Sequence, residues 1–199
     1  MKVYIDGENL RKSLARVLLD SKAIKNSRDL TTYHLRNLLQ DILATKDLDI
    51  HYYSSEIRLP NGYTPSDEIM SHVESIRSYS RKWVPNLKLQ NITYVKAGYL
   101  KVKSTKPCQK CHTIQETLQE KGVDVRIATD MLEDAYDDKQ NTIVIISSDT
   151  DLCPALHKVK ARNKKVIYVC MADSVNRAVS AVASETITIP AAKTKQYLK

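Results

Sequence analysis

The sequence predicts an α/β fold in which a mainly parallel sheet carries helices on both faces. Short β-branched segments alternate along the chain with segments whose apolar residues recur at helical spacing. The clearest strand, Thr142–Ile146, is an unbroken apolar run, as expected for a strand that is buried on both faces. The polar segment Ser147–Asp151 follows it at once and places two carboxylates just beyond the strand, at the edge where open α/β sheets form their binding crevice.

The other strands are short apolar runs that end at polar residues or at proline. In chain order, the predicted strands are Lys2–Ile5, Leu48–Tyr53, Ile92–Val95, Thr142–Ile146, Lys165–Val169 and Thr186–Ile189. The last run ends at Pro190, which suits a strand at the edge of the sheet.

Helices are predicted where apolar residues are spaced three or four positions apart, because this spacing places them on one helix face. These segments are Leu10–Leu18, Leu35–Ile42, Ser66–Trp83, Asp124–Tyr136, Leu152–Val159 and Asp173–Ala183.

Residues 97–120 differ from the rest of the chain. Lysines alternate with smaller residues up to a turn that contains proline, and a return segment, Thr113–Leu118, follows. We expect a β-hairpin-like excursion from the main sheet. Residues 1–190 are assigned to one domain that includes this excursion, and residues 191–199 to a basic C-terminal tail.

Composition narrows the class of protein. The 199 residues, 42% of them hydrophobic, suit one domain with a substantial core. A net charge of +8 favours an anionic partner. The chain enters a strand without a charged and apolar leader, and no apolar run approaches the ~20 residues that cross a bilayer. Four cysteines then predict reduced thiols and a cytoplasmic location, with no membrane partner.

Acidic residues mark the predicted binding edge. Asp6, Asp149 and Asp151 each follow a predicted strand by one to a few residues, and Asp124 opens a helix that should begin near the same edge. Carboxylates brought together without partners repel one another, whereas a divalent cation among them removes the repulsion. Mg²⁺ prefers a few carboxylates plus waters, and such a metal can polarise a phosphodiester and supply a hydroxide.

Each acid also has a purely structural interpretation. Asp151 and Asp124 are suitable helix caps, and Asp6 before a glycine is suitable for a turn. Asn9 either orients Asp6 or a water, or caps the first helix. Asp130 does not share a helix face with Asp124, so it is either a surface acid or a supporting group. Independent caps have no reason to gather at one sheet edge, which favours a common site.

Basic residues suggest an RNA-binding surface near this edge. Lysine and arginine neutralise the phosphate backbone, and interleaved tyrosines can stack on unpaired bases. The alternative is an ordinary solvated surface. The candidate RNA-binding residues are Lys96, Lys101, Lys103, Lys106 and Lys158.

Cys108 and Cys111 form a possible zinc half-site within the excursion. Structural zinc takes four ligands, and the remaining thiols, Cys153 and Cys170, lie on predicted core elements. We therefore favour free thiols and keep as alternatives an intramolecular zinc and a zinc shared between two subunits.

Three acidic blocks carry a family resemblance. Lys2–Asn9 (K-V-Y-I-D-G-E-N), Lys121–Leu132 (K-G-V-D-V-R-I-A-T-D-M-L) and Ile145–Leu152 (I-I-S-S-D-T-D-L) resemble those of the NYN domain family, particularly its LabA-like branch. That family belongs to the PIN-like nuclease superfamily. The resemblance implies a three-layer α/β/α fold and RNA cleavage that depends on Mg²⁺ or Mn²⁺.

The resemblance also assigns residues to roles. By position, Asp6, Asp124 and Asp149 match the metal-binding acids of the family, while Asp151 and Asn9 match supporting members. Asp130 matches a further acid that recurs in the family. Ser148 stands where the family commonly has glycine, which a serine can replace if the backbone there has negative φ.

The sequence thus predicts a divalent-metal-dependent ribonuclease that hydrolyses phosphodiester bonds and binds single-stranded or structured RNA, with a homo-oligomer possible. One alternative is a catalytically silent RNA-binding or regulatory module of the same fold. Another is a protein-interaction subunit whose acids only cap helices. Dinucleotide binding is disfavoured because the four glycines are not clustered.

Overall fold

The computed structural model describes residues 1–59, 64–107, 110–111, 114–137 and 141–198. The strands in this part of the chain are β1 (Lys2–Asp6), β2 (Asp49–Ile57), β3 (Thr93–Ser104), β4 (Glu116–Lys121), β5 (Thr142–Ile146), β6 (Lys165–Met171) and β7 (Glu185–Ile189). They form one sheet in the order β4-β3-β2-β1-β5-β6-β7. Neighbouring strands are parallel except β3 and β4, which are antiparallel.

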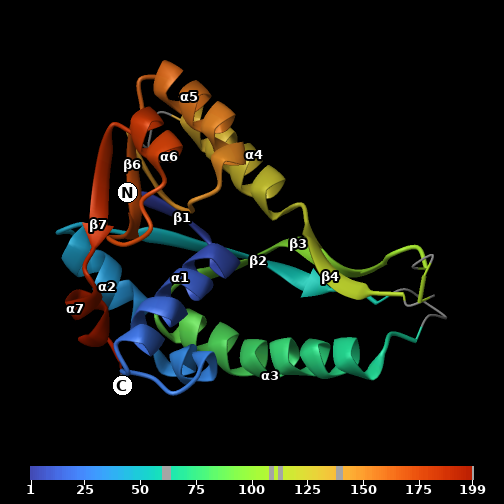
Figure 1. Cartoon of the computed structure of the whole chain (residues 1–199). Coiled ribbons are helices and arrows are strands. Elements are labelled where there is room, and N and C mark those ends of the chain that lie inside the picture. The colour runs from blue at the N-terminus through green and yellow to red at the C-terminus, as the bar shows by residue number, and fades with distance from the viewer. Residues whose placement is uncertain (60–63, 108–109, 112–113, 138–140, 199) are drawn as a thin grey trace.

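Helices cover both faces of this sheet (Figure 1). They are α1 (Gly7–Asp20), α2 (Leu35–Ile42), α3 (Asp67–Leu89), α4 (Val123–Ala135), α5 (Cys153–Ala161), α6 (Arg177–Val182) and α7 (Ala191–Lys195), with 3₁₀ turns at Ser27–Thr32 and Thr150–Leu152. Helices α1, α2, α3 and α7 lie on one face, and α4, α5 and α6 on the other. The predicted α/β fold with a mainly parallel sheet between two helical layers is confirmed.

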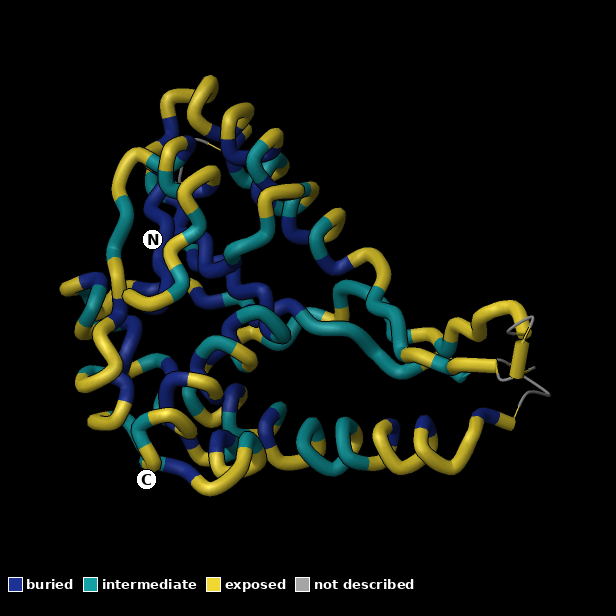
Figure 2. Tube along the Cα trace, viewed as in Figure 1, coloured by how far each residue is buried: buried dark blue, intermediate teal, exposed yellow. Residues whose placement is uncertain are grey.

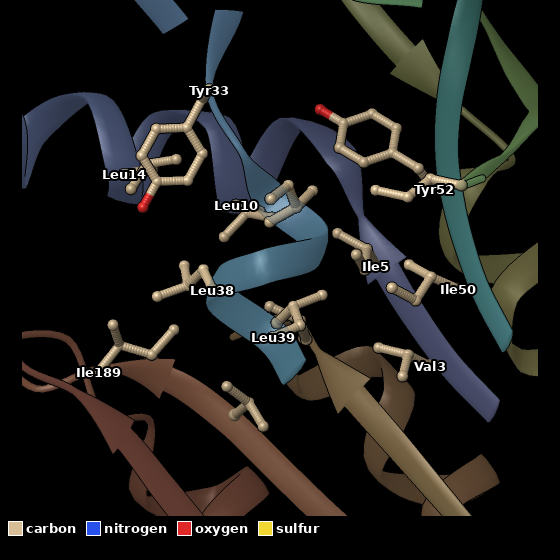
Figure 3. Packing of buried hydrophobic residues seen from close by; sticks show 14 of the residues in the cluster. Val3, Ile5, Leu10, Leu14, Tyr33, Leu38, Leu39, Ile50, Tyr52 and Ile189 are labelled. Atoms are coloured by element: carbon tan, nitrogen blue, oxygen red, sulfur yellow. The ribbon is translucent and has the colours of Figure 1, made fainter. Parts of the chain in front are cut away.

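The central strands are buried on both faces, which explains their unbroken apolar sequences. Val3 and Ile5 of β1 pack against α1 and α2 in one apolar cluster, whereas Tyr4 belongs to the cluster under α4 and α5. Figure 3 shows the first cluster, with Leu38 and Leu39 of α2 over the strands. Buried residues are concentrated in these strands, and the β3–β4 hairpin becomes exposed toward its far end (Figure 2).

Several element boundaries differ from the sequence-based expectation. The predicted strand Ile92–Val95 and the first arm of the excursion are one continuous strand, β3, which follows β2 as far as the Ile57–Leu100 pair. Helix α3 continues past Trp83 and contains Pro85, because Leu87 extends its apolar face and is fully buried. Proline removes one helical hydrogen bond, and the burial of the next turn compensates for it.

Helix α6 starts at Arg177 and not at Asp173, because Asn176 caps it. The Asn176 side chain accepts hydrogen bonds from the backbone N–H groups of Ala178 and Val179. Asn176 lies inside the predicted helix Asp173–Ala183, and the spacing of apolar residues does not indicate where a capping residue starts the helix.

The segment after residue 190, predicted as a tail, contains α7 and packs on the body of the domain. The Tyr33 hydroxyl donates to the Thr194 carbonyl at 2.9 Å, and the His34 backbone N–H donates to that of Tyr197 at 2.9 Å. The domain boundary at residue 190 stays a prediction. Within the described ranges, no helix combines the length and the apolar character that crossing a bilayer requires.

The chain passes tightly over β3 as it leaves β4 and enters α4. A Cβ added at Gly98 would lie 2.3 Å from the Lys121 carbonyl oxygen and 3.0 Å from the Val123 backbone nitrogen. Gly122, between them, has φ +92°, a conformation that favours glycine. The two glycines therefore allow α4 to begin directly over the sheet, with Asp124 in its first turn.

We expect Gly98→Ala to destabilise the protein by about 1–3 kcal/mol, because the contacted atoms are backbone and cannot rotate away. Urea unfolding followed by circular dichroism measures this change. As a control, Thr117→Ala on the exposed part of β4 should change stability by less than about 0.5 kcal/mol. Equal stability of the Gly98→Ala variant and the wild type would contradict the tight crossing.

Candidate acidic site at the carboxyl edge of the sheet

The candidate site lies where the order of the strands reverses. The chain proceeds from β1 to β2 and β3 on one side, and returns through α4 to place β5 on the other side of β1. Ligands of open α/β sheets bind outside the carboxyl ends of strands at such a switch point. Asp6 is the last residue of β1, and the Ser147–Asp149 segment follows β5 at this edge.

Asp6 is held rigidly at the edge. Only 8% of its surface is exposed, and its carboxylate accepts hydrogen bonds from the Asn9 backbone N–H at 3.0 Å and from Ser147 Oγ at 3.2 Å. Burial raises the pKa of Asp6; the Asn9 hydrogen bond opposes this, and the negative charge of Glu120 adds to it. Asp6 also caps α1, so the predicted turn role is replaced by a capping role.

Asn9 joins the first turn of α1 to the segment that follows β5. Its Nδ2 donates to Ser148 Oγ at 3.0 Å, and the Ser148 backbone N–H donates to Asn9 Oδ1 at 3.3 Å. On the other side, Asn176 Nδ2 donates to the Ser148 carbonyl oxygen at 2.8 Å. Ser148 is absent from the residues with positive φ, which explains why a serine fits there. Sequence reasoning missed Asn176 and Ser147, which bring no charge to the edge.

Asp149 directs its side chain back to its own loop. Its Oδ1 accepts from the Asp151 backbone N–H at 2.9 Å and so caps the 3₁₀ turn, while its own N–H donates to Ser147 Oγ at 3.2 Å. Ser147 thus contacts both Asp6 and Asp149. The predicted capping role of Asp151 is wrong, because Asp149 is the N-cap residue of the turn and Leu152 that of α5.

Asp124 lies within the electrostatic reach of the other acids. Its pKa is raised to about 6, first by burial and then by the negative charges of Asp149, Asp6 and Asp151. The alternative that Asp124 caps α4 is wrong, because Gly122 holds the N-cap position. Within the part of the chain that the structure describes, no ion pair joins a lysine or arginine to any of these four carboxylates.

Two further acids, which sequence reasoning missed, lie beside this group. Burial raises the pKa of Glu120 on β4, and the charges of Glu8 and Asp124 add to the effect, while its hydrogen bond with Ser55 opposes it. Burial also acts on Glu8, but ion pairs with Arg11 at 2.8 Å and Lys12 at 3.3 Å outweigh it and lower the pKa. Glu8 is therefore neutralised locally.

Asp130 does not join the acidic group. Its carboxylate accepts from the Tyr53 hydroxyl at 3.0 Å and pairs with Arg126 Nε at 2.7 Å. One helical turn further, Asp134 accepts from the Tyr4 hydroxyl and pairs with Lys2 at 2.6 Å. These contacts fasten α4, the helix that carries Asp124, to β2 and β1.

The candidate RNA-binding lysines are exposed but differ in their surroundings. Lys96 forms an ion pair with Glu56 at 2.6 Å. Lys101 and Lys103 project from β3, Lys106 follows that strand, and Lys158 lies on the outer side of α5. The zinc half-site cannot be placed, because Cys108 lies outside the described residues.

The donor chemistry of the acidic edge suits Mg²⁺ or Mn²⁺, because both bind carboxylate and amide oxygens. Asp6, Asp124, Asp149 and Asp151 offer carboxylates without a cationic partner among the described side chains, and their charges act on one another. A preformed ligand set is not present: in the described ranges, no three Asp, Glu, His or Cys side chains are arranged to hold a metal ion. These residues thus fit a divalent cation by chemistry and charge, with side-chain adjustment on binding.

A three-layer α/β/α fold with acids at the switch point is consistent with the class of PIN-like nucleases. The model of the NYN domain family matches residues 1–190, and the chain belongs to this family, which is part of the PIN-like superfamily. NYN domains are typically ribonucleases and generally use divalent metals. Assignment to the LabA-like branch stays a prediction.

No curated protein matches the chain. Among solved structures, a crystal structure of a protein of unknown function from Vibrio parahaemolyticus RIMD 2210633 is similar, with a TM-score of 0.48 and 12% sequence identity. The match covers 94% of this chain and 91% of that one.

The raised pKa of Asp124 predicts a pH-dependent loss of stability. An aspartate titrates near 3.8 in the unfolded chain, whereas Asp124 titrates near 6 in the folded one. Between these values the folded protein binds more protons, so the free energy of unfolding falls as pH rises through this window. We expect Asp124→Asn to be more stable than the wild type at about pH 7 without divalent metal, and this advantage to disappear near pH 4.

Urea unfolding at both pH values, in the presence of a chelator, measures the effect. Asp67→Asn is a matched control, since Asp67 is an exposed acid in the first turn of α3. Like Asp124→Asn, this substitution removes a favourable negative charge from a helix N-terminus, but it relieves no repulsion between carboxylates. We therefore expect no gain in the free energy of unfolding at about pH 7. An Asp124→Asn variant that behaves like this control would contradict the crowding of charges.

Proposed function

We propose that this protein is a divalent-metal-dependent ribonuclease that hydrolyses RNA phosphodiester bonds at the carboxyl edge of its sheet. The observation that carries the proposal is the group of Asp6, Asp124, Asp149 and Asp151, whose negative charges act on one another without a paired lysine or arginine among the described residues. Such an arrangement is unfavourable for folding alone, because desolvated like charges repel. Membership of the NYN family supports RNA as the substrate.

In this proposal, two of the acids are fixed by hydrogen bonds, and the other two adjust their side chains when the cation binds. Asp6 at the end of β1 and Asp149 in the segment after β5 would hold the cation, and Ser147 and Asn9 keep these two places together. Asp124 and Asp151 would complete the ligand set from α4 and the 3₁₀ turn. A bound Mg²⁺ or Mn²⁺ supplies charge stabilisation to the phosphate and lowers the pKa of a bound water. The amide of Asn9 would orient the Ser148 loop, and with it Asp149, toward the phosphodiester.

RNA would approach over exposed basic residues. Lys101, Lys103 and Lys106 lie along the hairpin that adjoins the edge, and Lys158 lies on α5. Phosphate contacts of this kind give affinity without sequence specificity. Lys96 is engaged with Glu56, so its contribution requires exchange of an exposed ion pair.

The alternative function is a catalytically silent RNA-binding or regulatory module of the same fold. The observation that favours it is that, among the described residues, no three acids are arranged ready to hold a metal. Asp149 and Asp6 also serve as caps, which gives each a structural reason to be acidic. Cleavage and binding assays on the same variants separate the two functions.

We expect the wild type to cleave single-stranded RNA in the presence of Mg²⁺ or Mn²⁺ and to lose the activity with a chelator. Asp149→Asn keeps the cap acceptor but removes the charge, so cleavage should fall by on the order of 100-fold or more, the range for losing one transition-state-stabilising group. RNA binding, measured by fluorescence anisotropy in chelator, should be unchanged or stronger.

The control is Asp173→Asn, which removes an exposed acid that pairs with Arg16. This variant should cleave at the wild-type rate. Chelator-resistant cleavage would overturn metal dependence. A purified wild type that binds RNA but never cleaves it, with Mg²⁺ or with Mn²⁺, would support the silent module.

The hairpin lysines should contribute to RNA affinity. We expect the triple change of Lys101, Lys103 and Lys106 to Gln to weaken binding of a single-stranded RNA and to reduce the salt dependence of log K by about two, roughly 0.7 for each phosphate contact. Anisotropy titrations over a range of salt concentrations measure this slope.

A triple change of Lys22, Lys25 and Lys88 to Gln alters the net charge equally at exposed positions away from the hairpin. If the two triple variants lose affinity by the same factor, the effect is one of net charge, and the hairpin has no special role in RNA binding.

A further inference from the structure

The side chain of Glu120 lies on the same face of the sheet as Asp6. Asp6 pairs in register with Tyr53 of β2, and Ser55 lies two residues further along that strand, on the same face. The Ser55 hydroxyl donates a hydrogen bond to the Glu120 carboxylate. The row from Asp6 through Ser55 to Glu120 therefore runs across the edge of the sheet beneath the start of α4.

The register of the hairpin separates Glu120 from the hairpin lysines. Glu120 is opposite Leu100, whereas Lys101 is opposite Gln119. Since successive residues of a strand point to opposite faces, Glu120 and Lys101 lie on opposite sides of the hairpin. Glu120 of β4 is thus on the face of the sheet on which Asp6 lies, and Lys101 of β3 is on the opposite face.

The charge of Glu120 acts on the candidate site. The negative charge of Glu120 raises the pKa of Asp6, and the negative charge of Asp124 raises the pKa of Glu120. No ion pair between described residues includes Glu120, although the charge of Lys12 lowers its pKa slightly. Glu8, the other acid missed by sequence reasoning, is by contrast paired with Arg11 and Lys12.

We propose that Glu120 is a positioning residue of the acidic site: its carboxylate, fixed by Ser55, increases the affinity of Asp6 and Asp124 for a divalent cation. This inference rests on the proposed metal-dependent function and extends it to the hairpin. The position of Glu120 depends on the crossing at Gly98, which brings the end of β4 back over β3. The hairpin would then contribute to cation binding as well as to RNA binding.

The test is the affinity for Mn²⁺ alone, measured by isothermal titration calorimetry without RNA. Glu120→Gln can still accept the Ser55 hydrogen bond, so it removes the charge with little change in shape. We expect it to weaken Mn²⁺ binding by about 10-fold, the low end of the effect of groups that support metal ligands. Glu120→Asp keeps the charge on a shorter side chain and should bind Mn²⁺ more tightly than Glu120→Gln.

Glu116→Gln is the matched control. Glu116 lies on the same strand, and its carboxylate accepts the Ser66 backbone N–H at 2.8 Å, which a glutamine oxygen can also do. Glu116→Gln changes the net charge by the same amount as Glu120→Gln. Because a distant charge is screened by salt, we expect the Mn²⁺ affinity of Glu116→Gln to be within about twofold of the wild type. Thermal melting of each variant in chelator shows that the variants are folded.

The outcomes separate the two proposals. If Asp149→Asn loses Mn²⁺ binding but Glu120→Gln behaves like Glu116→Gln, the role of Glu120 is overturned and the proposed function stands. If Glu120→Asp binds no better than Glu120→Gln, the charge is not the cause and the inference also fails. If the wild type and Asp149→Asn bind Mn²⁺ equally, the proposed metal site fails and the role of Glu120 fails with it.

Discussion

The proposed site is defined by an excess of negative charge at one edge of the sheet, which costs the fold some of its stability. The parallel strand order and the start of α4 bring the carboxylates of Asp6, Asp124 and Asp149 to the same edge, where no described lysine or arginine forms an ion pair with them. Partial burial removes the water that would screen the repulsion. The fold tolerates the repulsion because each acid also has a structural role. Asp6 and Asp149 accept capping hydrogen bonds, and Asp124 lies in the first turn of α4.

Much of the fold follows from sequence patterns with direct physical causes. Doubly buried strands require unbroken apolar runs, and β5 is the clearest example, since its predicted and observed limits agree at Thr142 and Ile146. The gathering of acids at one edge follows from parallel topology, because parallel strands present the same ends to the same side. The helix predicted to start at Asp124 begins one residue earlier, at Val123, and its prediction followed from apolar residues at helical spacing.

The parts that sequence did not predict depend on three-dimensional register. Glu120 reaches the edge only because β4 returns antiparallel to β3 and crosses at Gly98, and neither the pairing nor the direction of its side chain has a local signature. The extension of α3 past Pro85 is a similar case, since burial of Leu87 outweighs a local rule. Asn176 and Ser147 act through hydrogen bonds of their polar side chains, which apolar periodicity does not reveal.

The three roles of Asp6 have a practical consequence for genetics. The residue ends β1, accepts the hydrogen bond that starts α1 and presents a carboxylate to the edge, all through one side chain. A null phenotype from an alanine allele at this codon would therefore be uninterpretable, since misfolding and loss of chemistry would look the same in a cell. An allele is informative about biological role when the substituted side chain still accepts the same backbone hydrogen bond and only the charge is lost.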